Sequence, residues 1–321
     1  MTISDLYRSL AAELNEVEDG LEESIDLEIP LLYETSTHLL KAGGKRIRPL
    51  FVLVSGQFGD FRKEELITVA ITLELIHMAT LVHDDVIDDA ATRRGRETVK
   101  AKWDNKIAVY TGDYIFAKAL MRITEIPDER VQKILSHAIM EMSIGEIEQL
   151  HDFYRIQVGL RHYLRRIKRK TALLISISAA LGGLVSGAPQ DVVHLLRRFG
   201  YYVGMAFQIT DDILDFVGTE AELGKPAGSD IRQGNITLPT IYSLKSSPER
   251  ERLSHWIEAQ ELEERMADIL TLIREGGGIE YSRNLAKRYL EKARGVLEKL
   301  PSIPAREGLH AIADFIEKRK Y

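Results

Sequence analysis

The chain of 321 residues contains no cysteine, which excludes disulfides, zinc–thiolate sites and cysteine nucleophiles. It also lacks a basic excess: 43 lysines and arginines stand against 49 acidic residues, which argues against a general nucleic-acid binder. No P-loop, dinucleotide-binding fingerprint or nucleophilic triad pattern is present. Carboxylates are the only ligands that cluster, so the expected metal is a hard, oxygen-preferring ion, most simply Mg2+.

The N-terminal segment MTISDLYRSLAAELNEVEDG has no basic start followed by an apolar core, so we expect no signal peptide. The stretch from Thr171 to Ala188 carries no charge, but it is shorter than the ~20 residues that cross a bilayer, and it includes the pair Gly182-Gly183. We expect it to be a buried core helix. The sequence therefore predicts a cytoplasmic protein, with at most peripheral membrane contact through the basic segment 161–170.

Apolar residues recur at helical spacing almost throughout the chain, as in Leu66-Val69-Ala70-Leu73-Ile76. No run alternates with a period of two between hairpin turn pairs, so strands are not expected. Short breaks rich in glycine, proline or serine divide the pattern, and none is long enough to be an interdomain linker. The sequence predicts one all-α domain over residues 1–321, a bundle of about ten or more helices around a central cavity.

An acidic box occurs twice, as DDVID at Asp84–Asp88 and as DDILD at Asp211–Asp215. Residues four apart on a helix share a face, so Asp84 would pair with Asp88, and Asp211 with Asp215. Like charges at this spacing destabilise a bare helix, and a bound cation would remove that penalty. We interpret the boxes as two carboxylate clusters that face one cavity and share metal ions. The alternative is two solvated acidic patches, which the apolar residues on their flanks disfavour.

Basic residues stand close to the first acidic box. The segment GGKRIRP at residues 43–49 precedes it, and Arg93-Arg94-Gly95-Arg96 follows it. The glycines and the proline suit a loop that enters a helix, where free amides favour an anion. Metal-binding carboxylates beside basic donors are typical of sites for phosphate-bearing substrates, and the surrounding aliphatic residues suit a hydrocarbon. These residues predict a magnesium-dependent helical protein that handles diphosphates attached to apolar groups.

Three other functions are compatible with parts of this pattern. A His-Asp phosphohydrolase would use His77 and His83-Asp84 as metal ligands, but it leaves the second acidic box unexplained. A terpene cyclase ionises an allylic diphosphate in a helical, metal-dependent site. It needs no second anion site such as Lys45 and Arg48 provide. A non-catalytic or regulatory subunit would not require intact aspartates in both boxes.

The chain resembles the trans-prenyl diphosphate synthases in the type and order of its motifs. These motifs lie between about Ala42 and Asn235, and they read GGKRIRP, LVHDDVIDDAATRRGR, Gly145-Glu146-x-x-Gln149, Lys170-Thr171 and FQITDDILDF. The resemblance implies an all-helical isoprenoid synthase fold and a prenyltransferase that adds isopentenyl diphosphate in trans to an allylic diphosphate, with Mg2+. Across its length the chain is most similar to the large, catalytic component of two-component heptaprenyl diphosphate synthases.

That similarity implies a heptaprenyl product made from farnesyl diphosphate, as for a menaquinone side chain, and a heterodimer with a small regulatory subunit. The alternative within the family is a homodimeric enzyme with another product, from geranylgeranyl to octaprenyl diphosphate. The resemblance also implies roles for individual residues. Magnesium on the allylic diphosphate would be held by Asp84, Asp85, Asp88, Asp211, Asp212 and Asp215. Isopentenyl diphosphate would be bound by Lys45, Arg48, His77 and Arg94, and the allylic diphosphate by Arg93, Lys170, Thr171, Gln208 and Lys225.

Product length is predicted from the helix that leads into Asp84. Short-product members of the family tend to carry aromatic residues one turn before the first aspartate motif, where this chain has Ala79 and Thr80. With Ile76 a turn further back, these small side chains would leave a tunnel open for three turns, roughly 16 Å. The alternative is that Ala79 is small because another helix packs closely against it.

Overall fold

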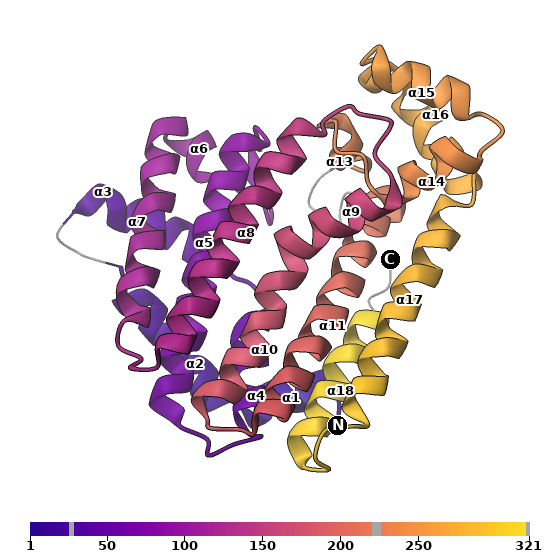
Figure 1. Cartoon of the computed structure of the whole chain (residues 1–321). Coiled ribbons are helices and arrows are strands. Elements are labelled where there is room, and N and C mark those ends of the chain that lie inside the picture. The colour runs from indigo at the N-terminus through magenta and orange to yellow at the C-terminus, as the bar shows by residue number, and fades with distance from the viewer. Residues whose placement is uncertain (26–28, 220–225, 319–321) are drawn as a thin grey trace. The chain divides into compact units, whose positions relative to one another are not determined.

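The computed structural model describes residues 1–25, 29–219 and 226–318 (Figure 1). It confirms the all-α prediction, since nearly every described element is a helix. The first half contains α1 (Ile3–Ser9), α2 (Ala11–Glu23), α3 (Pro30–Leu40), α4 (Ile47–Gly56), α5 (Lys63–Ile87), β1 (Thr92–Arg93), β2 (Arg96–Glu97), α6 (Val99–Lys102), α7 (Asn105–Ile123) and α8 (Glu129–His151). The second half contains α9 (Leu160–Ile167), η1 (Lys168–Ala172), α10 (Leu173–Val185), α11 (Gln190–Val217), α13 (Ser229–Arg232), α14 (Leu238–Ser246), α15 (Arg250–Glu258), α16 (Leu262–Glu275), α17 (Gly278–Leu297) and α18 (Pro304–Glu317).

The expectation of no strands was wrong at one place. β1 and β2 form a two-stranded antiparallel ribbon in which Arg93 pairs with Arg96. Arg94 and Gly95 make the turn with φ of 53° and 74°, the left-handed backbone that two-residue hairpin turns require. A ribbon of two residues a side is too short to show an alternating pattern, which is why the sequence did not indicate it.

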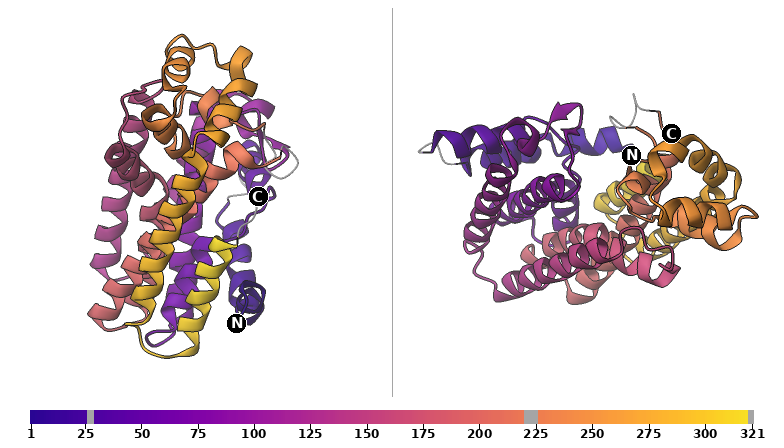
Figure 2. Two further views of the ribbon diagram at one scale, coloured as in Figure 1. Left: turned by 90° about the vertical axis from the view of Figure 1, so that its right-hand side faces the viewer. Right: turned by 90° about the horizontal axis from the view of Figure 1, so that it is seen from above.

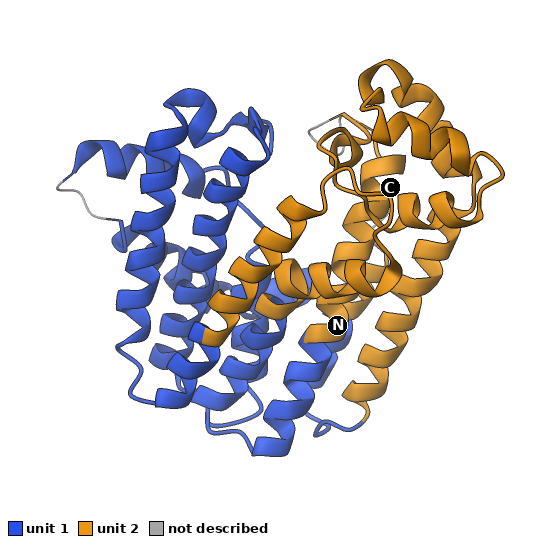
Figure 3. Cartoon of the chain, turned by 45° about the horizontal axis from the view of Figure 1, so that its top comes forward, with its two compact units in different colours: residues 1–136, 175–200, 299–312 blue, residues 137–174, 201–298, 313–321 orange. Residues whose placement is uncertain are grey.

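The chain divides into two compact units (Figure 3). Unit 1 comprises Met1–Ser136, Ile175–Gly200 and Lys299–Ile312, and unit 2 comprises His137–Leu174, Tyr201–Glu298 and Ala313–Tyr321. The predicted site residues are distributed over both, with the first acidic box in unit 1 and the second in unit 2. The assignment of residues 1–321 to one domain stays a prediction.

The core of unit 1 is built around α5, which packs against α2, α4 and α7. Leu66, Leu73 and Ile76 on α5 are fully buried, and burying each such side chain stabilises the fold by about 1.5–3 kcal/mol. α10 approaches α4 very closely: a Cβ at Gly182 would lie 2.2 Å from the carbonyl oxygen of Val52, so only glycine fits. The uncharged stretch is therefore the buried core helix that the sequence predicted.

The core of unit 2 is formed by α9, α11 and the helices that follow them. Its buried side chains include Tyr163, Ile209, Phe216, Leu253 and Ile269. α14 packs against α15, α16 and α17, and these helices are drawn in orange to yellow in Figure 2. α11, the helix that carries the second acidic box, packs against this apolar core.

α5 is the one helix in the described ranges that is long and apolar enough to cross a membrane. Within its most apolar window, however, 72% of the residues are buried inside the structure. A core helix has this pattern because its apolar surface is covered by neighbouring helices instead of lipid.

Candidate active site

The first aspartate group lies at the end of α5, in unit 1. Asp84 and Asp88 are one turn apart and partly exposed, and the Asp88 N–H donates to the Asp84 carbonyl (2.8 Å). Asp85 is buried, where its Oδ1 accepts a hydrogen bond from Arg93 Nε and forms an ion pair with Arg93 Nη2, both at 2.7 Å. Burial raises the pKa of Asp85, although Arg93 opposes the rise. Asp84 and Asp88 are thus left accessible to a ligand, while Asp85 is anchored inside.

Arg93 and Arg94, at the β1–β2 turn, contact different parts of unit 1. Arg93 pairs with Asp85 at the aspartate group. Arg94 reaches the loop before α4 instead, where its Nη1 lies 2.9 Å from the position that a Cβ on Gly44 would take. The hairpin therefore connects the acidic box to the basic segment 43–49.

A basic cluster surrounds the buried carboxylate of Glu74 on α5. Its members are Arg46, Arg48, His77 and Arg94, and Lys45 directly precedes Arg46 in the chain. Arg46 Nη1 lies 3.3 Å from Glu74 Oε1, and Arg46 also pairs with Glu18 of α2. The hydroxyl of Tyr7 on α1 donates to the carbonyl of Lys45. Helices α1, α2 and α5 thus hold the loop that carries Lys45, one of the predicted isopentenyl diphosphate ligands.

The charges of this cluster suit an anion. Burial lowers the pKa of Arg48 to about 10, with Glu74 opposing the fall, so Arg48 remains charged at neutral pH. Burial and the nearby arginines lower the pKa of His77 well below its usual value. His77 is therefore a neutral hydrogen-bonding group, and Glu74 is the counter-charge that keeps the arginines together.

Replacing Glu74 with glutamine is expected to lower the free energy of unfolding by about 3 kcal/mol, because one partner of a buried ion pair is lost. Inorganic diphosphate should restore part of this loss, since a bound anion compensates the arginines. Thermal unfolding with and without diphosphate measures both effects. Glu65→Gln on the same helix is the control, because Glu65 pairs with Arg62 near the surface and should matter by less than about 1 kcal/mol. Similar small losses in both variants would contradict the role of Glu74.

The second aspartate group lies on α11, in unit 2. Asp211 is partly exposed, whereas Asp212 and Asp215 are buried. Asp212 accepts hydrogen bonds from Tyr163 (2.6 Å) and from Gln208 Nε2 (2.8 Å). Asp215 Oδ2 accepts from the backbone N–H of Asp230 (3.1 Å). Asp211 is therefore the partly exposed member of this group, whereas Asp215, four residues further on, is buried and held by the backbone of Asp230.

Lys170 and Thr171 lie on η1, a widened π-helical turn between α9 and α10. Such turns are frequent at functional sites, because they redirect side chains out of the regular helix. Arg169 fixes the turn through ion pairs with Glu141 (2.9 Å) and Glu148 (2.6 Å) of α8. Lys170 Nζ lies 3.2 Å from Glu146 Oε2, and Thr171 donates to Gln208 Oε1 (2.5 Å). The structure thus brings Thr171, Gln208 and Asp212 together.

Each aspartate group has carboxylates that suit a divalent cation shared with a ligand. Burial, together with the charge of Asp230, raises the pKa of Asp212 to about 7, so a cation nearby would favour its ionised form. Within residues 1–25, 29–219 and 226–318, no three His, Asp or Glu side chains are placed to hold a metal ion by themselves. Magnesium commonly takes one or two carboxylates and completes its shell with water and substrate phosphates. The partly exposed aspartates of each group suit a magnesium ion that is bound in this way.

The remaining predicted residues are the three chain-length residues on α5 and Lys225. Ile76 and Ala79 are fully buried on α5, and Thr80 is partly exposed and donates to the His77 carbonyl (2.8 Å). The proposed chain-length role of these residues stays a prediction. Lys225 lies outside the described residues.

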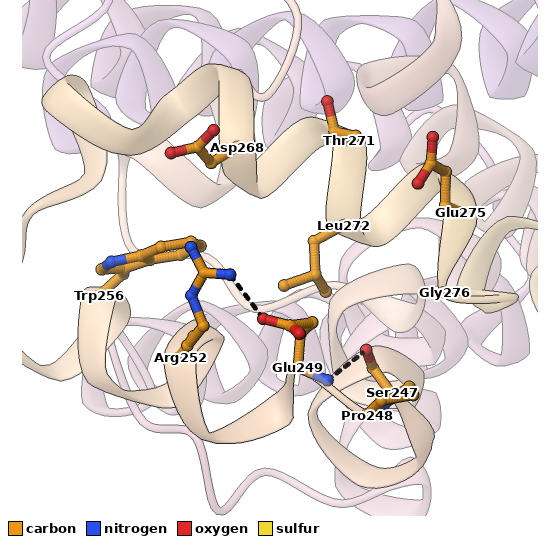
Figure 4. A pocket seen from close by; sticks show the side chains of 10 residues that line it. All are labelled: Ser247, Pro248, Glu249, Arg252, Trp256, Asp268, Thr271, Leu272, Glu275 and Gly276. Carbon is orange, nitrogen blue, oxygen red and sulfur yellow. Dashed lines mark hydrogen bonds and ion pairs between the residues drawn. The ribbon is translucent and has the colours of Figure 1, made fainter.

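A surface hollow of about 360 Å3 lies elsewhere in unit 2, between α15 and α16 (Figure 4). Trp256 and Arg252 line one side of it, and Asp268, Thr271 and Glu275 line the other. It contains none of the predicted site residues. The chemistry is therefore assigned to the two aspartate groups and the basic cluster.

The polyprenyl synthetase family model matches residues 29–273, which include both aspartate groups, the basic cluster and η1. The chain belongs to the polyprenyl synthetase family. A heptaprenyl diphosphate synthase component 2 from Geobacillus stearothermophilus is 51% identical to this polyprenyl synthetase over 321 residues, the full length of both chains. The chain is accordingly a prenyltransferase.

Solved structures agree with this family assignment. A heptaprenyl diphosphate synthase from Staphylococcus aureus has a TM-score of 0.91 and 39% identity, with 97% of this polyprenyl synthetase and 99% of that chain covered. A polyprenyl synthase from Caulobacter crescentus, solved with calcium and isoprenyl diphosphate, has a TM-score of 0.95 and 31% identity, with 99% and 98% covered. The isoprenoid synthase fold implied by the motifs is therefore confirmed.

Several site residues were not predicted from the sequence. They are Glu74 and Glu18 beside the basic cluster, and Tyr163, Glu141, Glu148 and Asp230 in unit 2. Tyr163 stands seven residues before Lys170, but this spacing alone indicates nothing in a helix. Glu74 was hidden because a glutamate in an amphipathic helix is usually on the solvated face.

Proposed function

We propose that the chain is a magnesium-dependent trans-polyprenyl diphosphate synthase that makes heptaprenyl diphosphate from farnesyl diphosphate and isopentenyl diphosphate. The observation that carries this proposal is that the two arginines at the β1–β2 turn contact different groups. Arg93 serves the aspartate group and Arg94 serves the basic cluster, so unit 1 provides for two separate anions. Chain elongation needs two diphosphates, whereas cyclisation needs one.

We assign the basic cluster to isopentenyl diphosphate, through Arg48, Arg94 and the neutral His77, together with the adjacent Lys45. Bound magnesium would neutralise charge on the allylic diphosphate, and Asp84, Asp88 and Asp211 are the accessible carboxylates to hold it. Arg93 and Lys170 add positive charge where the leaving diphosphate becomes more negative. Thr171 and Gln208 contribute oxygens beside the developing allylic cation. Holding both substrates in register accounts for most of the acceleration.

The test is incubation of the chain with farnesyl diphosphate, labelled isopentenyl diphosphate and Mg2+, with and without a candidate small subunit, followed by sizing of the products. Labelled C35 diphosphate is the expected result. Phosphate release without carbon–carbon bond formation would instead support a phosphohydrolase. Cyclic hydrocarbon from the allylic substrate alone would support a cyclase.

We further propose that a partner subunit covers an apolar stripe on α8. Met140, Ile144, Ile147 and Leu150 lie on one side of this helix with exposed fractions of 50, 36, 67 and 46%. Monomeric proteins seldom expose such a row, because its burial against a partner is favourable. The Geobacillus stearothermophilus relative is named as component 2, which supports a small second component in preference to a homodimer.

Replacing Ala79 with phenylalanine is expected to shorten the product to about three or four isoprene units. The helix carries Ala79 and Ile76 fully buried before Asp84, and an aromatic ring would block a tunnel that passes there. Product sizing and thermal unfolding are measured on the same sample. If the position only packs against another helix, the ring would instead cost roughly 1–3 kcal/mol of stability. An active variant that still makes the full-length product would show that the tunnel does not pass Ala79.

We propose a cytoplasmic location. α5, which is long and apolar enough to cross a membrane, is mostly buried inside the structure, and this supports a protein that does not cross the membrane. Arg161, Arg165 and Lys168 are exposed on one side of α9 and the start of η1. Their charge supports at most a peripheral contact with an anionic membrane during product release.

A further inference from the structure

Four side chains of unit 2 form a continuous hydrogen-bonded series that ends at Thr171. Tyr163 is fully buried, and its hydroxyl donates to Asp212 Oδ2 (2.6 Å). Gln208 Nε2 donates to Asp212 Oδ1 (2.8 Å), and Gln208 Oε1 accepts from the Thr171 hydroxyl (2.5 Å). Gln208 and Asp212 are one turn apart on α11, so this helix meets α9 and η1 at two points.

The series has a fixed direction, because the Tyr163 hydroxyl and the Gln208 amide nitrogen both donate to Asp212. This orients the Gln208 amide with Oε1 toward Thr171. A carbonyl oxygen only accepts, so the hydroxyl hydrogen of Thr171 is committed to Gln208. The lone pairs of Thr171 Oγ1, which carry partial negative charge, remain available on its other side.

We propose that Tyr163 is a positioning residue of the elongation reaction, which acts through Asp212 and Gln208 to keep the lone pairs of Thr171, and not its hydrogen, directed at the allylic cation. This inference rests on the proposed function, because it places the cation beside Thr171. Without the Tyr163 hydroxyl, the Asp212 carboxylate is fixed through one oxygen instead of two. It can then rotate about its Cβ–Cγ bond, and the Gln208 amide loses its fixed orientation. The hydroxyl hydrogen of Thr171 is then no longer held by Gln208 and can turn toward the substrate. Its partial positive charge would oppose the allylic cation that forms in the transition state.

A double-mutant cycle between Tyr163→Phe and Thr171→Val tests the proposal. Single-turnover rates are measured with farnesyl diphosphate and isopentenyl diphosphate, in the presence of any subunit that the wild type requires. Tyr163→Phe should lower the rate about tenfold, equivalent to about 1.4 kcal/mol, with KM for both diphosphates within about twofold. In the Thr171→Val background, which has no hydroxyl to orient, it should change the rate by less than about twofold.

Tyr154→Phe is the matched control, because it also removes a phenolic hydroxyl from unit 2, one that donates to the Arg232 carbonyl (3.3 Å). Its rate should equal that of the wild type. An equal loss from Tyr163→Phe in both backgrounds, or no loss in either, would overturn the proposal. If Tyr163→Phe does not fold, the cycle is run with Gln208→Leu, and additive effects with Thr171→Val would overturn it as well. A wild type that makes no elongated product refutes the proposed function instead.

Discussion

Replacing Asp84 or Asp211 with alanine is expected to lower turnover by about 100-fold or more while the fold remains intact. Each is the accessible carboxylate that begins its aspartate group, so each is available to a magnesium ion shared with the allylic diphosphate. Loss of a group that stabilises charge in the transition state commonly has an effect of this size. Stability should not fall, because removing one of several clustered like charges relieves repulsion. Steady-state rates at several Mg2+ concentrations, together with thermal unfolding, measure both expectations.

Asp89→Asn is the control for these variants. Asp89 directly follows the first acidic box, is 90% exposed at its side chain, and pairs with Lys100. It also has a φ of 51°, which asparagine tolerates well, so the substitution should not disturb the backbone. Its activity should stay close to that of the wild type. An Asp84→Ala or Asp211→Ala enzyme that retains more than about a tenth of wild-type activity would contradict the metal role.

The purified chain is expected to make little or no elongated product by itself and to gain this activity when a small subunit is added. The apolar stripe on α8 and the component 2 name of the Geobacillus stearothermophilus relative support this expectation. Activity is measured as a function of the added subunit, and association by analytical ultracentrifugation. Full long-chain synthesis by the isolated chain would refute the dependence.

Ile147→Glu tests where the subunit binds. Ile147 is the most exposed member of the α8 stripe, at 67%, so a charge there should leave the fold unchanged. It should weaken association by more than tenfold, because a carboxylate would have to be desolvated at the interface. Gln190→Glu adds the same charge at an exposed position at the start of α11, and should bind normally. Unchanged association of Ile147→Glu would place the partner elsewhere.

Local patterns in the sequence predicted the features that depend on short separations. The pairing of Asp84 with Asp88 follows from helical spacing, and the breaks between helices follow from glycine and proline. The contacts that orient the site arise between distant segments instead. Arg46 and Glu74 are 28 residues apart, and Tyr163 and Asp212 are 49 residues apart. Such pairs are decided by tertiary packing, so no local period indicates them.

Tertiary packing also explains why Asp85 and Asp212 differ from Asp84 and Asp211, the first aspartates of the two boxes. The sequence treats the aspartates of each box alike, and the resemblance assigned all of them to metal. In the structure, Asp85 is held by Arg93, and Asp212 by Tyr163 and Gln208. Burial separates the second aspartate of each box from the first, and burial depends on which helix covers that face.

Because η1 is a widened turn, the number of residues between Tyr163 and Thr171 decides where their side chains lie. The Leu173 N–H bonds to the Lys168 carbonyl, five residues back, so the turn holds one residue more than a regular α-helical turn. Removing one residue between Tyr163 and Thr171 would rotate everything beyond it by about 100°. Tyr163 and Thr171 would then no longer meet Asp212 and Gln208 together. Insertions and deletions among relatives should therefore be excluded from residues 163–171, even where the side chains themselves vary.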